Sequence, residues 1–283
     1  MPTPTLRTWD RRYGLGPSRR SSGGHRRYDS ADLWRLGQMR RLVGQGVAPA
    51  EAARQALAAP LPPAASAAVA SPPAASPPVE VADRLARLER ATARMDVRTL
   101  SAALPEALAA LGVVWTWEKL VLPVLTAVTH DQERTGAGVE VEHLLSERVL
   151  AALAHHAQSL RTDGARPALL ACAEEEQHSL PVHALAAALA EQGVTTWVLG
   201  ARTPYRALGD AVRRVRPGAV FVWSQQEATG DPAPLAALPR PRPACRVVVG
   251  GPGWPGGLPG DVVRVGTLRD AVATIAAAVA AAP

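Results

Sequence analysis

The chain has 283 residues, enough for two or three domains, and 47% of them are hydrophobic, so it can bury a sizeable core. It carries 31 basic and 25 acidic side chains, and residues 1–60 hold eleven arginines but only four acids. Such a cationic end is typical of a module that binds nucleic acid.

The cysteines and the termini exclude several other classes of protein. Cys172 and Cys245 lie far apart in apolar runs, which argues against a disulfide framework or a thiolate metal site. The polar, arginine-rich N-terminus does not have the pattern of a signal peptide, and no apolar run is long enough to span a membrane. We therefore expect a cytoplasmic protein with no membrane partner and with DNA as its leading partner.

The first predicted elements form a small basic domain. Residues 5–13 (TLRTWDRRY) predict a short helix, and residues 15–29 predict a hairpin with a glycine-containing turn between two basic arms. A second helix over 31–46 places the apolar residues between Leu33 and Val43 on one face. Helix, basic hairpin and helix in this order predict a winged helix-turn-helix, whose helix enters the major groove while the hairpin holds phosphates.

The run LRTWDRRYGLGPSRRSSGGHRRYDSADLWRL (residues 6–36) resembles the MerR family of transcription regulators. That family begins with a further helix upstream of this run, so we expect this chain to lack its first helix. The resemblance and the basic hairpin together imply DNA contacts from the recognition helix, the first hairpin arm and the wing, in that order: Arg7, Arg11, Arg12, Arg19, Arg20, His25, Arg26, Arg27 and Tyr28.

A tether separates this basic domain from the rest of the chain. Residues 60–79 consist mostly of proline, alanine and serine and carry no charge, so they predict an extended and fairly stiff linker. We therefore expect a DNA-binding domain over 1–59, a linker over 60–79, a helical cap over 80–164 and a last domain over 165–283.

The segment that follows the linker is expected to be helical. Residues 81–95 have apolar side chains three to four residues apart, at Val81, Leu85 and Leu88. Residues 114–128 and 139–160 also predict helices. We expect four helices around a small core.

From residue 166 the pattern changes to strands that alternate with helices. Short apolar runs predict strands, and the segments between them predict helices ending at glycine stops. The alternation predicts a doubly wound parallel sheet of the Rossmann-like α/β class, in which ligands bind at the carboxyl ends of the strands. The strands are expected over 167–173, 195–200, 218–224, 245–251 and 261–266, and the helices over 178–193, 203–218 and 267–280.

Residues suited to a metal-containing ligand follow three of these strands. Glu176, Gln177 and His178 come after the first, and an acid can orient an imidazole and raise its basicity as a metal ligand. Ser224 follows the third strand and Gly250-Gly251 the fourth, and such small groups leave a slot for a long ligand tail.

This spacing resembles the cobalamin-binding domain shared by methionine synthase, methylmutases and light-sensing regulators. The resemblance implies that His178 is the lower axial ligand of cobalt and that Ser224, Gly250 and Gly251 accommodate the base and the nucleotide tail. Two positions depart from the pattern, because Pro181 replaces a glycine and Gln226 replaces an aliphatic residue.

The helical segment resembles the four-helix cap of CarH/LitR-type photoreceptor regulators, which bind adenosylcobalamin between cap and sheet and respond to light. The segments concerned are WTWEKLVLPVL and GAGVEVEHLLSERVL. The resemblance implies cofactor contacts from Gln132, Val139, Glu142 and His143. Gln132 stands where the family has a tryptophan, and Glu133 stands where some members have a histidine, so the upper ligand and the light response stay open.

These observations together predict a multidomain, cobalamin-binding and light-responsive repressor that forms homo-oligomers. The cofactor would set the oligomeric state and the affinity for DNA. No catalytic module remains once the DNA-binding domain over 1–59 (the head), the cap and the sheet domain are assigned. We therefore expect that the protein is not an enzyme. The alternatives are a cobalamin carrier that serves a methyl-transferring partner enzyme, and a MerR-like regulator that senses another ligand such as a bilin.

Overall fold

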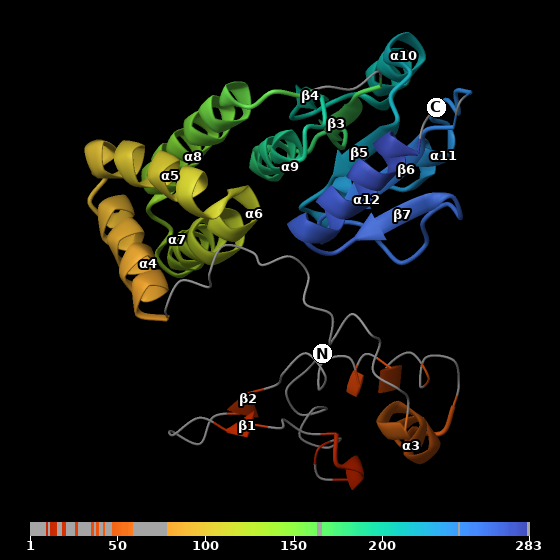
Figure 1. Cartoon of the computed structure of the whole chain (residues 1–283), viewed down its shortest axis with the longest axis horizontal. Helices are drawn as coiled ribbons and strands as arrows, with labels where there is room; N and C mark the ends of the chain where they lie inside the picture. The colour runs from red at the N-terminus through yellow and green to blue at the C-terminus, as the bar shows by residue number, and fades with distance from the viewer. Residues whose placement is uncertain are drawn as a thin grey trace. The chain divides into compact units, whose positions relative to one another are not determined.

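The computed structural model describes residues 10, 12–15, 19–20, 26–27, 35–36, 38–39, 42, 47–58, 78–162, 166–242 and 244–281. The chain divides into two compact units, residues 1–75 and 76–283 (Figure 1). Across the described ranges, every helix is too short or too polar to span a bilayer. The linker expected over 60–79 lies outside the described residues except for its last two, which begin a helix at Pro78.

The first unit contains the predicted basic hairpin. Strand β1 (Arg19–Arg20) pairs antiparallel with strand β2 (Arg26–Arg27), and Arg19 stands opposite Arg27. Arg12 is helical, as expected for the recognition helix. Four other predicted DNA contacts lie outside the described residues: Arg7, Arg11, His25 and Tyr28.

A small core holds this unit together. Met39 is fully buried and packs with Leu15 and Leu36, as the apolar face of the second predicted helix requires. The core is completed by helix α3 (Pro49–Ala58), whose Ala52 and Ala56 are also fully buried. Helix α3 was not predicted, and its signal was the three-to-four spacing of these alanines.

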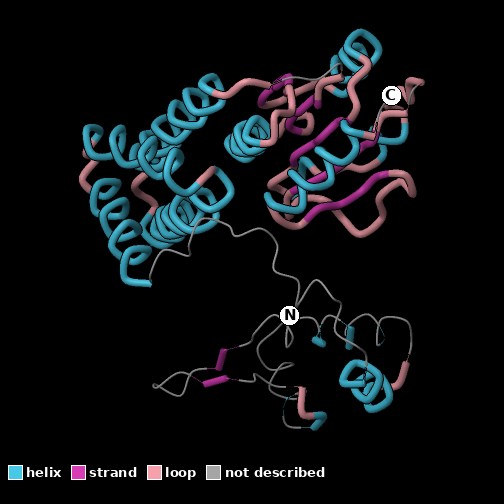
Figure 2. The backbone as a smooth tube through the Cα atoms, viewed as in Figure 1, coloured by secondary structure: helices cyan, strands magenta, loops and turns pink. Residues whose placement is uncertain are grey.

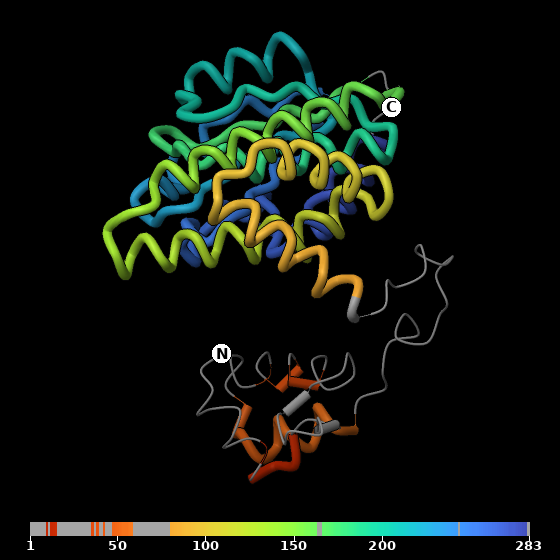
Figure 3. Tube along the Cα trace, turned by 90° about the vertical axis from the view of Figure 1, so that its left-hand side faces the viewer, coloured from red at the N-terminus to blue at the C-terminus, as the bar shows by residue number. Residues whose placement is uncertain are grey.

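The second unit begins with the cap, in which four helical rods lie side by side (Figure 3). The first two rods turn at Asp96, whose side chain accepts from the Thr99 N–H at 3.1 Å and caps the second rod. The third rod contains a π-helical segment, a feature frequent at functional sites. The rods are α4 (Pro78–Ala93), then α5 (Val97–Leu111), then α6 (Val113–Thr116) with η2 (Trp117–Val121) and α7 (Leu122–Thr135), then α8 (Val139–Ser159).

The doubly wound parallel sheet is confirmed. All neighbouring strands pair in parallel, and the order across the sheet is β4-β3-β5-β6-β7 (Figure 1). Figure 2 shows these strands in magenta, with cyan helices beside them. Each observed strand lies within a predicted one, because runs of buried β-branched and aliphatic residues are typical of parallel sheets. The strands are β3 (Ala168–Cys172), β4 (Thr196–Gly200), β5 (Ala219–Trp223), β6 (Arg246–Gly250) and β7 (Val262–Val265).

Helices cover both faces of this sheet. On one face Leu170 of β3 packs in the same cluster as residues of α9 (Leu180–Glu191) and α12 (Leu268–Ala280). On the other face Leu169 packs with residues of α10 (Tyr205–Val215) and the short α11 (Ala233–Ala236). The sequence patterns predicted α9, α10 and α12 but missed α11 and the single turn η3 (Glu227–Thr229).

Helix α9 joins the cap to the sheet. Its Leu185 and Leu189 are buried in the sheet-side cluster, while Ala184 and Ala187 belong to the core of the cap. Alanine allows the cap helices to approach closely on that side. The cap and the α/β domain therefore share one helix, and the loop that carries His178 leads directly into it.

A partly buried carboxylate joins the far end of α9 to two cap helices. Glu191 Oε1 accepts from the Val113 N–H at 2.9 Å, at the start of α6, and lies 2.9 Å from His156 Nε2 of α8. The side chains of Glu191 and His156 are 23% and 15% exposed. A carboxylate at a helix N-terminus also interacts favourably with the helix dipole.

Replacing Glu191 with alanine is expected to lower the free energy of unfolding by about 1–3 kcal/mol, because Val113 N–H and His156 would lose their partner. Urea unfolding followed by circular dichroism measures the change. Glu147→Ala, at an exposed position of α8, serves as the control and should stay within about 0.5 kcal/mol of the parent. Equal stability of the two variants would contradict this role.

Candidate ligand-binding site at the carboxyl edge of the sheet

The loop between β3 and α9 buries one acidic side chain and exposes the neighbouring histidine. The Glu176 side chain is 1% exposed, whereas the His178 side chain is 51% exposed. Glu175 adopts a left-handed conformation with φ of 65°, and this turn precedes the buried carboxylate. The Arg202 N–H of the next strand-to-helix loop donates to the Glu176 carbonyl at 2.8 Å and holds the turn in place.

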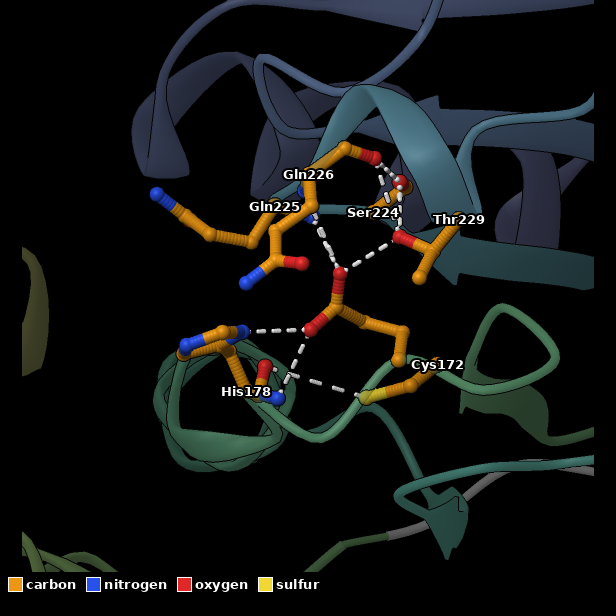
Figure 4. A network of polar contacts seen from close by, with 7 residues as sticks. Cys172, His178, Ser224, Gln225, Gln226 and Thr229 are labelled. Carbon is orange, nitrogen blue, oxygen red and sulfur yellow. Dashed lines mark hydrogen bonds and ion pairs between the residues drawn. The ribbon is translucent and has the colours of Figure 1, made fainter.

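The Glu176 carboxylate accepts hydrogen bonds from two loops (Figure 4). Oε1 accepts from the His178 N–H at 2.8 Å and lies 2.5 Å from His178 Nδ1. Oε2 accepts from the N–H groups of Gln225 and Gln226 at 2.8 and 3.3 Å and from Thr229 Oγ1 at 2.7 Å. The carboxylate thus joins the loop after β3 to the loop after β5.

These hydrogen bonds determine the charge of Glu176. Burial raises the pKa of the carboxyl group, but donation from His178 N–H, Thr229 and Gln225 N–H outweighs burial and lowers the pKa to about 2. The group is therefore a carboxylate at neutral pH and can only accept. His178 Nδ1 must then carry its proton toward Glu176, which leaves the lone pair on Nε2 for a metal.

The same argument orients two hydroxyl groups. Ser224 is fully buried, and its Oγ lies 2.8 Å from Thr229 Oγ1 and 3.0 Å from the Gln226 carbonyl. Because the Glu176 carboxylate has no proton to give, Thr229 donates to it, and Ser224 donates to Thr229 or to the carbonyl. Ser224 therefore stabilises the network indirectly, through its contacts with Thr229 and the Gln226 carbonyl. Thr229 was missed from the sequence, where its only signal was a hydroxyl in the turn after the third strand.

A cavity of about 590 Å³ lies at the same edge of the sheet. It is bounded by the cap, by α9 and α12 and by the ends of three strands. Its walls are largely apolar. They include Trp117 and Leu122 of the cap, Phe221 and Trp223 of β5, Leu185 of α9 and Arg264 of β7. The sequence predicted a slot here but did not predict the aromatic walls.

Gly250 and Gly251 line this cavity, but packing between strand ends explains both. A Cβ on Gly251, whose φ is +102°, would lie 2.0 Å from the Ser224 carbonyl oxygen, and one on Gly250 would lie 2.7 Å from Phe221 Cζ. Gly266 also lines the cavity, and a Cβ there would meet nothing within 4 Å. Ser224, by contrast, is part of the polar network and not of the cavity wall.

The predicted cap contacts lie outside this cavity wall. Gln132 Nε2 donates to the Gly138 carbonyl at 2.9 Å, where it ties the end of α7 to the start of α8. Glu142 accepts from Ser146 at 2.9 Å, and His143 is 73% exposed. Val139 and Gln177 are also exposed. Contacts from these side chains to a cofactor stay predictions.

A metal that binds here would have few protein ligands. No group of three or more histidine, cysteine or acidic side chains among the described residues could hold a bare metal ion. His178 therefore suits a metal whose other ligands come from a cofactor and not from the protein.

Comparisons with known proteins agree with this organisation. Residues 1–58 match the family described as MerR HTH family regulatory protein. The HTH-type transcriptional repressor CarH of Myxococcus xanthus is 34% identical over 213 residues, which cover 75% of this chain and 71% of that protein. The HTH-type transcriptional regulator MlrA of Escherichia coli (strain K12) is 46% identical over 43 residues, 15% of this chain and 18% of that one.

A solved structure extends the comparison to the fold. The monomethylamine corrinoid protein of Methanosarcina barkeri superposes with a TM-score of 0.55 at 14% identity, over 68% of this chain and 97% of that chain. This similarity shows the fold of the second unit. The 213 residues matched to CarH exceed the length of the first unit, so the likeness extends beyond the head. The chain belongs to the MerR family of helix-turn-helix transcription regulators, together with CarH.

Proposed function

We propose that this chain is a cobalamin-binding transcriptional repressor whose oligomeric state and affinity for DNA are set by the bound cofactor. One observation carries the proposal: the ionised Glu176 holds His178 Nδ1 and leaves Nε2 as a metal ligand on an exposed side chain. The similarity to a protein named as a repressor supports the regulatory half. The fold shared with a corrinoid protein is compatible with the cofactor.

The residues present fit a cobalamin. His178 would be the axial ligand on the lower face of cobalt, and a single protein ligand suffices because the corrin ring supplies four others. The largely apolar cavity beside Gly250, Gly251 and Gly266 would hold the nucleotide tail. Bound adenosylcobalamin would supply a cobalt–carbon bond that light can cleave.

Helix α9 would transmit the binding of the cofactor from the His178 loop to the cap. His178 lies two residues before this helix, whose alanines pack into the cap. A metal on His178 Nε2 would hold the loop and the first turn of α9 in one position. The packing of α9 against the cap would then differ between the cofactor-bound and the empty protein. The assembly of several copies of the chain would change as a result.

The residues expected at the upper face of the cofactor differ from the family pattern. Gln132 stands at the position where the family has a tryptophan, and its side-chain amide is bonded to Gly138. We therefore propose cobalamin as the ligand class and adenosylcobalamin as the form to test first. We propose a sensor without turnover of its own, because the head matches DNA-binding regulators.

The experiment begins with the full chain purified in the dark and incubated with adenosylcobalamin, methylcobalamin or hydroxocobalamin. After removal of free cofactor, absorption spectra are recorded before and after green light, and the elution volume is measured. Retained colour with a change of size on loading or on illumination supports the proposal. A colourless protein from all three incubations would remove it and would leave a regulator of another ligand.

Thr229→Val is expected to weaken cobalamin binding about 10- to 100-fold, because it removes one donor to Glu176 and loosens the orientation of His178. Titration with hydroxocobalamin, followed by absorption, measures the affinity. The matched control is Thr126→Val, which removes an exposed hydroxyl of α7 that bonds only the Leu122 carbonyl. Unchanged affinity in the Thr229 variant would show that this hydroxyl does not position the ligand.

A further inference from the structure

Exposed arginines gather at the amino edge of the sheet, opposite the candidate ligand site. Three come from the end of α10, at the start of β5, and three come from the segment that leads into β6. They are named together as the amino-edge patch: Arg213, Arg214, Arg216, Arg240, Arg242 and Arg246.

Backbone contacts bring these two segments together. Arg246 is the first residue of β6 and pairs in register with Ala219, the first residue of β5. The Arg246 N–H donates to the Gly218 carbonyl at 3.1 Å, two residues after Arg216. Arg216 stands three residues before the start of β5, and neighbouring strands lie about 4.8 Å apart, so both segments carry their arginines at the same edge of the sheet. Arg240 pairs with Asp261, the residue before β7, and therefore lies at the same edge of the sheet.

The positive charge of the patch is only partly neutralised. Asp210 pairs with Arg213 at 2.8 Å, and Asp261 pairs with Arg240 at 2.7 Å. For Arg214, Arg216, Arg242 and Arg246, no carboxylate of the described ranges lies within ion-pair distance. The six arginines of the patch and their two paired acids sum to a formal charge of +4.

The opposite edge of the same domain is acidic. The loops that follow β3 and β5 carry Glu174, Glu175, Glu176, Glu227 and Asp231. Arg202 pairs with Glu175 and Arg264 lines the cavity at that edge, but the acids outnumber these arginines, so a polyanion would be attracted to the amino edge. Guanidinium groups also match phosphate oxygens in a bidentate geometry.

We propose that the amino-edge patch is a second DNA-binding surface, which contacts the phosphate backbone of the duplex next to the segment bound by the head. The partner follows from charge and family: the surface suits a dense row of phosphates, and the chain belongs to a DNA-binding family. The proposal rests on DNA binding by the head and is independent of cobalamin. The contacts are to backbone and carry no sequence preference.

The test uses the full cobalamin-free chain and a mixed-sequence duplex of about 60 base pairs, with fluorescence anisotropy over a salt series. The patch variant is Arg214→Ala with Arg242→Ala and Arg246→Ala. Its matched control replaces three exposed cap arginines, Arg90→Ala with Arg94→Ala and Arg98→Ala. The head variant is Arg11→Ala with Arg26→Ala, and a lysine version of the patch variant keeps the charge.

The patch variant is expected to bind about tenfold more weakly at moderate salt, and the slope of log affinity against log salt should fall by about 2 to 3. The control and the lysine version should keep the parent slope. Affinity and slope equal to those of the control would overturn the proposal. A loss that comes with an altered elution volume without DNA would also overturn it, because the patch would then contact protein. An unaffected head variant would count against the head's role and not against the patch.

Discussion

His178→Ala is expected to lower the affinity for cobalamin by at least about 100-fold, the largest effect that we predict for a single side chain of the site. We propose this imidazole as the axial ligand of cobalt, and Glu176 orients it through Nδ1. The side chain is half exposed, but its removal takes one donor from the buried Glu176 carboxylate, so the free energy of unfolding of the empty protein should fall by about 1–3 kcal/mol. Titration in the dark, followed by absorption, measures the affinity.

Two controls separate ligation from general damage. His130→Ala removes an exposed histidine of α7 and should leave the affinity unchanged. Free imidazole added to the His178 variant should restore part of the binding, because it can replace the missing ligand. Parent-like affinity in the His178 variant would mean that cobalamin, if retained, is held by other groups.

Gly251→Ala is expected to destabilise the second unit by about 3–5 kcal/mol, a large share of the 5–15 kcal/mol typical of a domain. The new Cβ would lie 2.0 Å from the Ser224 carbonyl oxygen, in a backbone with φ of +102°. A left-handed backbone costs about 1–3 kcal/mol for a residue with a side chain, and the clash adds to this strain. Urea unfolding in the absence of cobalamin measures the change.

The same chain provides a matched control. Gly256 lies in the loop before β7, and a Cβ there would meet nothing within 4 Å. Gly256→Ala should therefore stay within about 0.5 kcal/mol of the parent. If Gly251→Ala destabilised the empty protein by less than about 1 kcal/mol, close packing against Ser224 could not be the reason for this glycine.

The α/β domain was predictable because its strands are encoded locally. Runs such as residues 219–223 and 247–249 are apolar and rich in valine, and turn residues separate them from helical segments. Alternation of strands and helices then leaves a parallel sheet as the consistent arrangement. Helix α11 and turn η3 were missed because each is too short to show a helical period.

The candidate site was predictable only at the positions that directly follow strands. Glu176 and His178 carry a recognisable spacing, and the structure brings them into contact. Thr229 contacts Glu176 across 53 residues, and no local pattern reports a contact of that kind. The aromatic cavity wall was missed for the same reason, since Trp117 reaches it from the π-helical segment of the cap.

The roles of the glycines and of Gln132 depend on their surroundings. Gly250 and Gly251 were expected to make room for a ligand, whereas Phe221 and Ser224 already fill the space beside them. Gln132 was placed by its position in a motif, and its hydrogen bond to Gly138 became visible only with the turn between α7 and α8. A sequence motif predicts which element carries a residue, whereas the role of that residue depends on the side chains and backbone that surround it in the fold.

We propose that this chain couples cobalamin binding at His178 to DNA binding by the head. The direct measurement is the affinity for a duplex selected from random-sequence DNA by the loaded protein. It is determined in the dark with and without adenosylcobalamin, for the parent and for His178→Ala. We expect the cofactor to change the affinity of the parent at least about tenfold and to leave the variant unaffected. Equal DNA affinity of the parent with and without retained cobalamin would contradict the account.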